Sequence, residues 1–334
     1  MARRTGIGSC CRSPEPLSFS AKPTMNTLVQ RRWPVAALLL IVLFVTGFAV
    51  VQANVLGMGE RVERWSALVE NWIDPPPDRP TLPTVVVTRE PSPSPTPEIT
   101  PEPSASPTPK PTPIPRVAVD VDLVEDPAAI FTSQITEKDC AVAGTQMVLT
   151  ILGLGQAGNE FQTQIHDRIH EWESLQDSLN GGWGPAAVGN ALAAYGATGY
   201  EVRAYDTYAD ALWDSAIAIT EMDKPVVMFP WWGAHTWVMT GYRADADPTL
   251  FDDAVIGGAY ILDPWYPRTS SIWGTSDGPG NFEDLAELER NWPAYQGPPG
   301  YEAIGPGWTR PEGAYPDRDG RFVVLIPTTP REGS

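Results

Sequence analysis

Between residues 117 and 327 the chain shows first the hydrophobic spacing of helices and then that of strands. The segment CAVAGTQMVLTILG places apolar side chains three and four residues apart. This spacing predicts a helix that begins at Cys140 and ends in a left-handed cap at Gly153. The same spacing predicts two further helices, over residues 159–176 and 185–195.

After residue 199 the pattern changes to the short apolar and alternating runs that are typical of β-strands. Strands are predicted in the segments YEVRAY, KPVVMFP, HTWVMTGYR, GAYILDP and GRFVVLIP. Because the helices come first and the strands follow, we predict an α+β domain in which N-terminal helices pack on an antiparallel sheet.

An uninterrupted apolar stretch, WPVAALLLIVLFVTGFAVV, precedes this domain and covers Trp33 to Val51. About 20 apolar residues are enough to cross a bilayer as a helix, and the residues before the stretch are rich in Arg. We therefore predict a basic cytoplasmic tail (1–32), a transmembrane signal anchor (33–55), and a single-pass location in the cell membrane with an extracellular domain. A cleaved secretory signal, with the start at Met1 or Met25, is the alternative.

The segments that connect this anchor to the domain differ from both in composition. Residues 56–74 have the spacing of a short amphipathic helix beside the membrane. Residues 75–116 hold 16 prolines among Ser, Thr and Glu, so they are predicted to form a disordered stalk that buries no core. Residues 117–334 remain for one globular domain.

The chain is strongly acidic, with a formal net charge of -18 and a pI of about 4.5. Binding to nucleic acid requires a surface rich in Lys and Arg, so the charge argues against a nucleic-acid partner.

Candidate chemistry begins at Cys140, the only cysteine after Cys11. A thiolate is a strong nucleophile that a helix N-terminus and a nearby imidazole both stabilise. His235 heads one predicted strand and Asp263 ends the next, so the carboxylate would orient the imidazole as in a nucleophile, base and orienter set. Gln134 lies six residues before Cys140 and would donate its amide to an oxyanion.

This order of motifs resembles the papain-like cysteine peptidases, and most closely cysteine peptidase family thirty-nine, the bacteriocin-leader-processing group and its bacterial relatives. The resemblance covers roughly residues 126–267 and includes GGWGPAAVGNALAAYG and KPVVMFPWWGAHTWVMTGYRAD. It implies a papain-like fold and a peptidase that hydrolyses a peptide or amide bond through an acyl-enzyme. In that reading Cys140 is the nucleophile, His235 the general base, Asp263 the orienting group and Gln134 the oxyanion donor.

Two other patterns suggest different sites. HDRIH places His166 and His170 one helical turn apart, like the zinc ligands of a metallopeptidase, although a solvated helix face is the favoured interpretation. No metal or cofactor is therefore predicted. Several tryptophans form a candidate trough for peptide or glycan: Trp231, Trp232, Trp237, Trp265, Trp273 and Trp308.

The expected partner is a peptide substrate, either a secreted peptide or a peptide of the cell wall. Two alternatives stay open at this stage. One is a transglutaminase-like acyl transferase, which uses the same order of Cys, His and Asp. The other is a catalytically inactive papain-like surface module that binds peptide or glycan.

Overall fold

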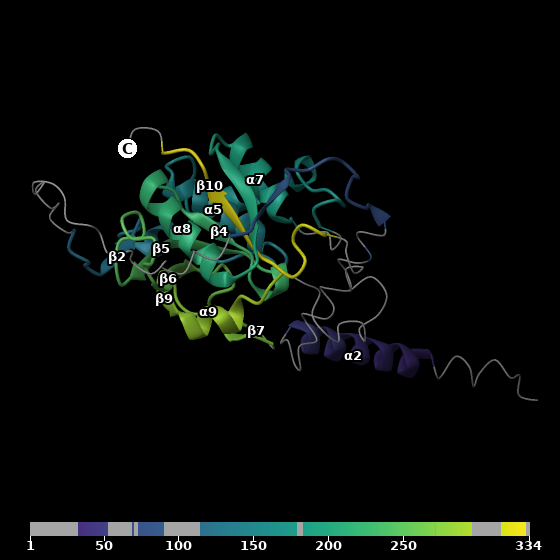
Figure 1. The fold of residues 1–334 in the computed structure, drawn as a ribbon. Coiled ribbons are helices and arrows are strands. Elements are labelled where there is room, and N and C mark those ends of the chain that lie inside the picture. Colours follow the sequence, from purple (N-terminus) through teal and green to yellow (C-terminus); the bar gives the residue numbers. More distant parts are fainter. Residues whose placement is uncertain are drawn as a thin grey trace, which may run out of the picture. The chain divides into compact units, whose positions relative to one another are not determined.

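A computed structural model describes the chain in several stretches: residues 33–52, 69, 73–89, 114–178, 183–270, 272–295 and 315–331. The chain divides into two compact units, residues 1–59 and 60–334. The first contains helix α2 (Trp33–Gln52), and the second contains every other described element (Figure 1).

Helix α2 occupies the stretch that is predicted as a membrane anchor. A helix that crosses the hydrocarbon core, about 30 Å thick, needs about 20 apolar residues. The side chains of α2 are described for residues 37–49. Within the described part of the chain, no helix is both long enough and apolar enough to cross a membrane. The predicted transmembrane signal anchor is therefore wrong, and so is the predicted single-pass location in the cell membrane with an extracellular domain. The amphipathic helix predicted at 56–74 lies almost wholly outside the described residues.

The second unit is built from short helices and strands. The helices are α4 (Pro127–Ile130), α5 (Cys140–Ile151), α6 (Asn159–His166), α7 (Pro185–Ala194), α8 (Tyr208–Met222) and α9 (Leu285–Asn291), with 3-10 turns η2 (Ile169–Glu171) and η3 (Trp231–Gly233). The strands are β1 (Thr84–Val87), β2 (Val119–Asp122), β3 (Tyr200–Tyr205), β4 (Val226–Met228), β5 (Trp237–Ala244), β6 (Ile256–Leu262), β9 (Asn281–Asp284) and β10 (Phe322–Pro327), and a separate ribbon joins β7 (Thr269–Ser270) to β8 (Gly274–Thr275).

The main sheet has the strand order β1-β3-β10-β4-β5-β6-β9, and β2 pairs with the end of β5. All of these pairs are antiparallel except β1 with β3, which is parallel. The predicted antiparallel sheet is therefore wrong, because the edge of β3 is paired with a strand from the segment predicted as a stalk. The sheet is mixed.

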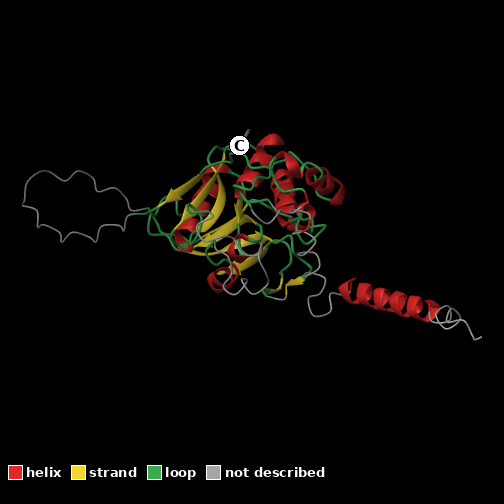
Figure 2. Cartoon of the chain, turned by 90° about the vertical axis from the view of Figure 1, so that its right-hand side faces the viewer, coloured by secondary structure: helices red, strands yellow, loops and turns green. Residues whose placement is uncertain are grey.

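Helices cover both faces of this sheet. Along β10, Val323 and Leu325 point into a core with α5 and α7, whereas Val324 and Ile326 point into a second core with α8 and α9. Figure 2 shows the strands together, with the largest group of helices on one side of them. Strands that are buried on both faces read as continuous apolar runs, as KPVVMFP does. The papain-like arrangement is not confirmed, since helix α8 between β3 and β4 and a mixed sheet were not part of the prediction.

Several predicted elements are nevertheless confirmed. Helix α5 begins at Cys140, and Gly153 follows its end with a left-handed φ of 74°. Helix α7 and the five predicted strands lie where their patterns place them. The predicted helix 159–176, however, ends at His166 and gives way to η2.

The first part of the proline-rich segment belongs to the folded unit. The carbonyl of Pro77 accepts a hydrogen bond from Leu175 at 3.1 Å, and Arg79 Nε donates to the Glu173 carbonyl at 2.8 Å. Leu82 packs against the core that α5 and α7 share with the sheet. The boundary of the domain therefore lies before β1, and residues 90–113 of the predicted stalk lie outside the described residues.

We expect Leu82→Ala to lower the unfolding free energy by about 1–2 kcal/mol, because it removes a half-buried side chain packed beside Leu325. Thermal melts of the variant measure this change. The matched control is Val85→Ala on β1, whose side chain is 42% exposed. Equal melting temperatures for both variants would show that the segment contributes nothing to the core.

Candidate active site

Cys140 is the first residue of α5, a helix of 12 residues. Asp139 precedes it, but the Asp139 carboxylate does not cap the helix. It accepts instead from the backbone N–H of Thr136 at 3.0 Å and meets Nδ1 of His166 at 2.9 Å. The amides of the first turn, which have no acceptor within the helix, are therefore left for another negative group near Cys140.

A glycine lets α5 approach the start of β5 closely. Gly144 lies one turn after Cys140 on the same side of the helix. A Cβ at Gly144 would come within 2.7 Å of the Thr236 methyl carbon, which is closer than two carbons can pack. The missing side chain therefore allows the face of α5 that carries Cys140 to lie beside His235, the residue before Thr236.

His235 and Asp263 meet at one end of the sheet. Strands β5 and β6 are antiparallel neighbours with Val238 opposite Leu262, so the residues before β5 and after β6 lie at the same end. His235 Nε2 and Asp263 Oδ1 are 2.6 Å apart. The exposed fraction is 2% for His235 and 7% for Asp263, so both residues are buried. The same Oδ1 accepts from the Trp265 backbone N–H at 2.9 Å.

Cys140 is a further hydrogen-bond partner of the His235 side chain. Burial lowers the pKa of His235, but the charge of Asp263 and the hydrogen bonds to Asp263 and Cys140 outweigh it and raise the pKa to about 9. Burial likewise raises the pKa of Asp263, yet the charge of His235 and hydrogen bonds from His235, Ser276 and Trp265 bring it below its ordinary value. The pair is therefore an imidazolium and a carboxylate at neutral pH.

An indole ring covers the imidazole. Trp231 stacks on His235 with ring centroids 4.0 Å apart and an angle of 17° between the planes. An aromatic face attracts a cation, so this contact also favours the imidazolium. Trp231 and Trp232 have positive φ values of 55° and 59°, which are strained for residues with a side chain. The strained backbone therefore lies in the segment that places the Trp231 indole on His235.

The predicted trough is only partly assembled. Trp265 and Trp273 lie against Trp231, and Trp232 lies against Trp273. Trp237 is buried in the core on the other face of the sheet, and Trp308 lies outside the described residues.

Gln134 is fixed in the loop before α5. Its backbone N–H donates to the Pro264 carbonyl at 2.9 Å, which ties the loop to the residue after Asp263. Its side-chain Nε2 donates to the Thr136 carbonyl at 2.8 Å, and one amide hydrogen remains for another acceptor. The structure thus ties the Gln134 backbone to the residue after Asp263, while one of its two side-chain amide hydrogens is used inside the loop.

Buried glutamines anchor this loop to two helices. Gln162 on α6 accepts from the Ile135 backbone N–H at 2.8 Å and donates to the Ser133 carbonyl at 3.2 Å. It also donates to Gln146 on α5 at 3.0 Å. A buried polar network with its partners satisfied is rigid, so the loop that leads to Cys140 has a defined position.

The two histidines of HDRIH do not form a pair. His166 is the last residue of α6 and contacts Asp139, whereas His170 lies in η2 and meets Glu173 Oε1 at 2.6 Å. The helix stops between them, so the one-turn spacing that the zinc interpretation needs does not exist.

Three contributors to this site were not predicted from the sequence. They are the contact of His166 with Asp139, the stacking of Trp231 on His235, and the hydrogen bond of Ser276 to Asp263. Only Trp231 carried a signal, because it lies four residues before His235 in a segment rich in Trp and Gly. The other two contacts join residues that are distant in the sequence.

No protein-family model matches the chain, and no curated protein matches it either. The resemblance to family thirty-nine therefore rests on the motif residues alone.

We expect Gly144→Ala to slow the alkylation of Cys140 by iodoacetamide by about tenfold or more, since the new Cβ must push α5 away from Thr236. Mass spectrometry of the Cys140 peptide measures the rate. The double variant Gly144→Ala/Thr236→Ser removes the methyl group that the Cβ would meet and should restore much of the rate. A wild-type rate in Gly144→Ala would show that the close approach does not position Cys140.

Proposed function

We propose that the chain is a thiol hydrolase, similar to a cysteine peptidase, that cleaves a peptide or amide bond through an acyl-enzyme. The observation that carries this proposal is the buried contact of His235 with Asp263, together with the hydrogen bond between His235 and Cys140 at a helix start. Each role in a nucleophile, base and orienter set then has its own residue.

In the first step the Cys140 thiolate attacks the carbonyl carbon of the substrate. A carbon–sulfur bond forms, and the carbonyl electrons move to oxygen as an oxyanion. The backbone N–H of Cys140, at the first position of α5, and the remaining amide hydrogen of Gln134 are the donors proposed for this oxyanion.

The tetrahedral intermediate then collapses to a thioester. The imidazolium of His235 gives its proton to the leaving nitrogen as the carbon–nitrogen bond breaks. Because Nε2 of His235 is held by Asp263, the proton leaves from Nδ1. Asp263 keeps its charge and stabilises the imidazolium in the resting state.

Water completes the cycle. Neutral His235 takes a proton from the water molecule, whose oxygen attacks the thioester carbon, and the carbon–sulfur bond breaks. The carboxylic acid product leaves, and the thiolate and the imidazolium are regenerated. Every proton in the cycle passes through one imidazole, whose raised pKa suits the acid half of the reaction.

The expected substrate is a peptide, either a secreted one or one from the cell wall. The aromatic group of Trp231, Trp232, Trp265 and Trp273 beside His235 supports a substrate with apolar surface next to the cleaved bond.

We expect the full chain to cleave members of a diverse peptide library, and Cys140→Ser to reduce the rate by about 10⁴-fold or more. Mass spectrometry of the products measures cleavage and its sequence preference. The chain offers a matched thiol control, Cys10→Ser/Cys11→Ser, which should cleave as fast as the wild type. Equal cleavage by wild type and Cys140→Ser, or none by the wild type across the library, would contradict the proposal.

A further inference from the structure

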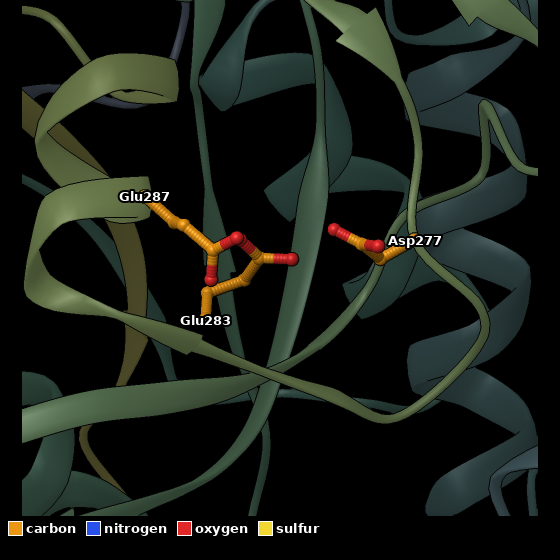
Figure 3. Close-up of side chains that lie close together, drawn as sticks. All are labelled: Asp277, Glu283 and Glu287. Atoms are coloured by element: carbon orange, nitrogen blue, oxygen red, sulfur yellow. The ribbon is translucent and has the colours of Figure 1, made fainter.

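Outside the set of Cys140, His235, Asp263 and Gln134, three carboxylates meet between the edge of the sheet and a loop. Glu283 lies on β9, Glu287 in the first turn of α9, and Asp277 in the loop between β8 and β9. One oxygen from each lies within 4.8 Å of the other two. Figure 3 shows the Glu283 and Glu287 carboxyl groups against each other, with Asp277 turned toward them from the opposite side.

Glu283 is the buried member of this group. Only 5% of the residue is exposed, and its Oε2 is buried with no hydrogen-bond partner in the described part of the structure. Its Oε1 has a long contact of 3.5 Å with Asn281 Nδ2. A buried carboxylate without a partner is costly, so this oxygen requires either a proton or a cation.

The neighbours of Glu283 make its charge more costly. It is buried next to the carboxylates of Glu287 and Asp277, each of which brings one oxygen within 4.8 Å of a Glu283 oxygen. Glu287 accepts a capping hydrogen bond from the Asp284 backbone N–H at 3.4 Å. The three carboxylates therefore repel one another, and a cation bound between them would offset the repulsion.

We propose that Asp277, Glu283 and Glu287 bind a calcium ion. Calcium takes oxygen ligands at about 2.3–2.6 Å, so oxygens on opposite sides of the ion lie up to about 5 Å apart, which the spacing of these three allows. Magnesium retains most of its water and usually takes one or two carboxylates. Three carboxylates from three separate backbone positions therefore favour calcium.

The position of this site links it to Asp263. Asp277 directly follows Ser276, whose side chain hydrogen-bonds Asp263. An ion held by Asp277 would fix the loop that carries Ser276, and so steady the carboxylate that orients His235. This consequence rests on the proposed function, whereas the ion site itself does not.

Binding is tested on the full chain after removal of metal with EDTA. Calorimetric titration with calcium chloride should show one ion per chain, and calcium at about 100 times its dissociation constant should raise the melting temperature by roughly 5–10 °C. Magnesium chloride at the same concentration should have a smaller effect. Neither readout depends on thiol activity, so a failure here is distinct from a failure of the proposed hydrolase.

Glu283→Gln keeps the shape of the side chain and removes its charge. We expect the calcium response to disappear and the metal-free melting temperature to equal or exceed that of the wild type, because the repulsion is relieved. Asp277→Asn, at an exposed position where folding is not at stake, should weaken binding by at least about tenfold. The control is Glu289→Gln, an exposed acid on α9 outside the group. No response of the wild type to calcium at millimolar concentration, or a full response in Glu283→Gln, would overturn the proposal and leave a shared proton as the partner of Glu283.

Discussion

The buried hydrogen bond between His235 and Asp263 is the interaction on which the candidate site depends. Two charged groups in the interior lose their hydration, and the loss is offset only when each has close partners. Asp263 accepts hydrogen bonds from three donors, one of which is His235 itself, and His235 lies between the carboxylate, the cysteine and an indole. The surrounding backbone, including two strained tryptophans, is arranged to supply these partners.

The sheet determines where this pair forms, and α5 determines what the pair can act on. Neighbouring antiparallel strands bring His235 and Asp263 to one end of the sheet, and helices on both faces hold those strands in a dry core. The contact of Gly144 with Thr236 then sets the start of α5 beside the imidazole. Since the capping residue Asp139 turns its carboxylate away, the first turn of α5 stays open for a negative group.

How much of this could be predicted from the sequence depends on the range of the contacts. The start of α5 at Cys140 and the placement of His235 and Asp263 follow from local spacing, so they were predictable. The parallel strand β1 was missed because the proline-rich composition around it outweighed the short run TVVV. Helix α8 was missed because its helical spacing lies between two segments with clear strand patterns. The Ser276 contact and the group of three carboxylates follow no helical or strand spacing, since both depend on the path of the loop between β8 and β9.

The central claim is that His235 and Asp263 form a buried imidazolium–carboxylate pair, and an NMR titration of the His235 imidazole tests it most directly. The folded-state pKa of His235 is raised to about 9, so the imidazolium persists below that pH and is lost above it. The ring resonances of His235 should therefore remain those of an imidazolium up to about pH 8 in the wild type. In Asp263→Asn the midpoint should fall, because the variant removes the negative charge that raises the pKa of His235. A midpoint near the ordinary histidine value of about 6.5 in the wild type, unchanged in Asp263→Asn, would contradict the account.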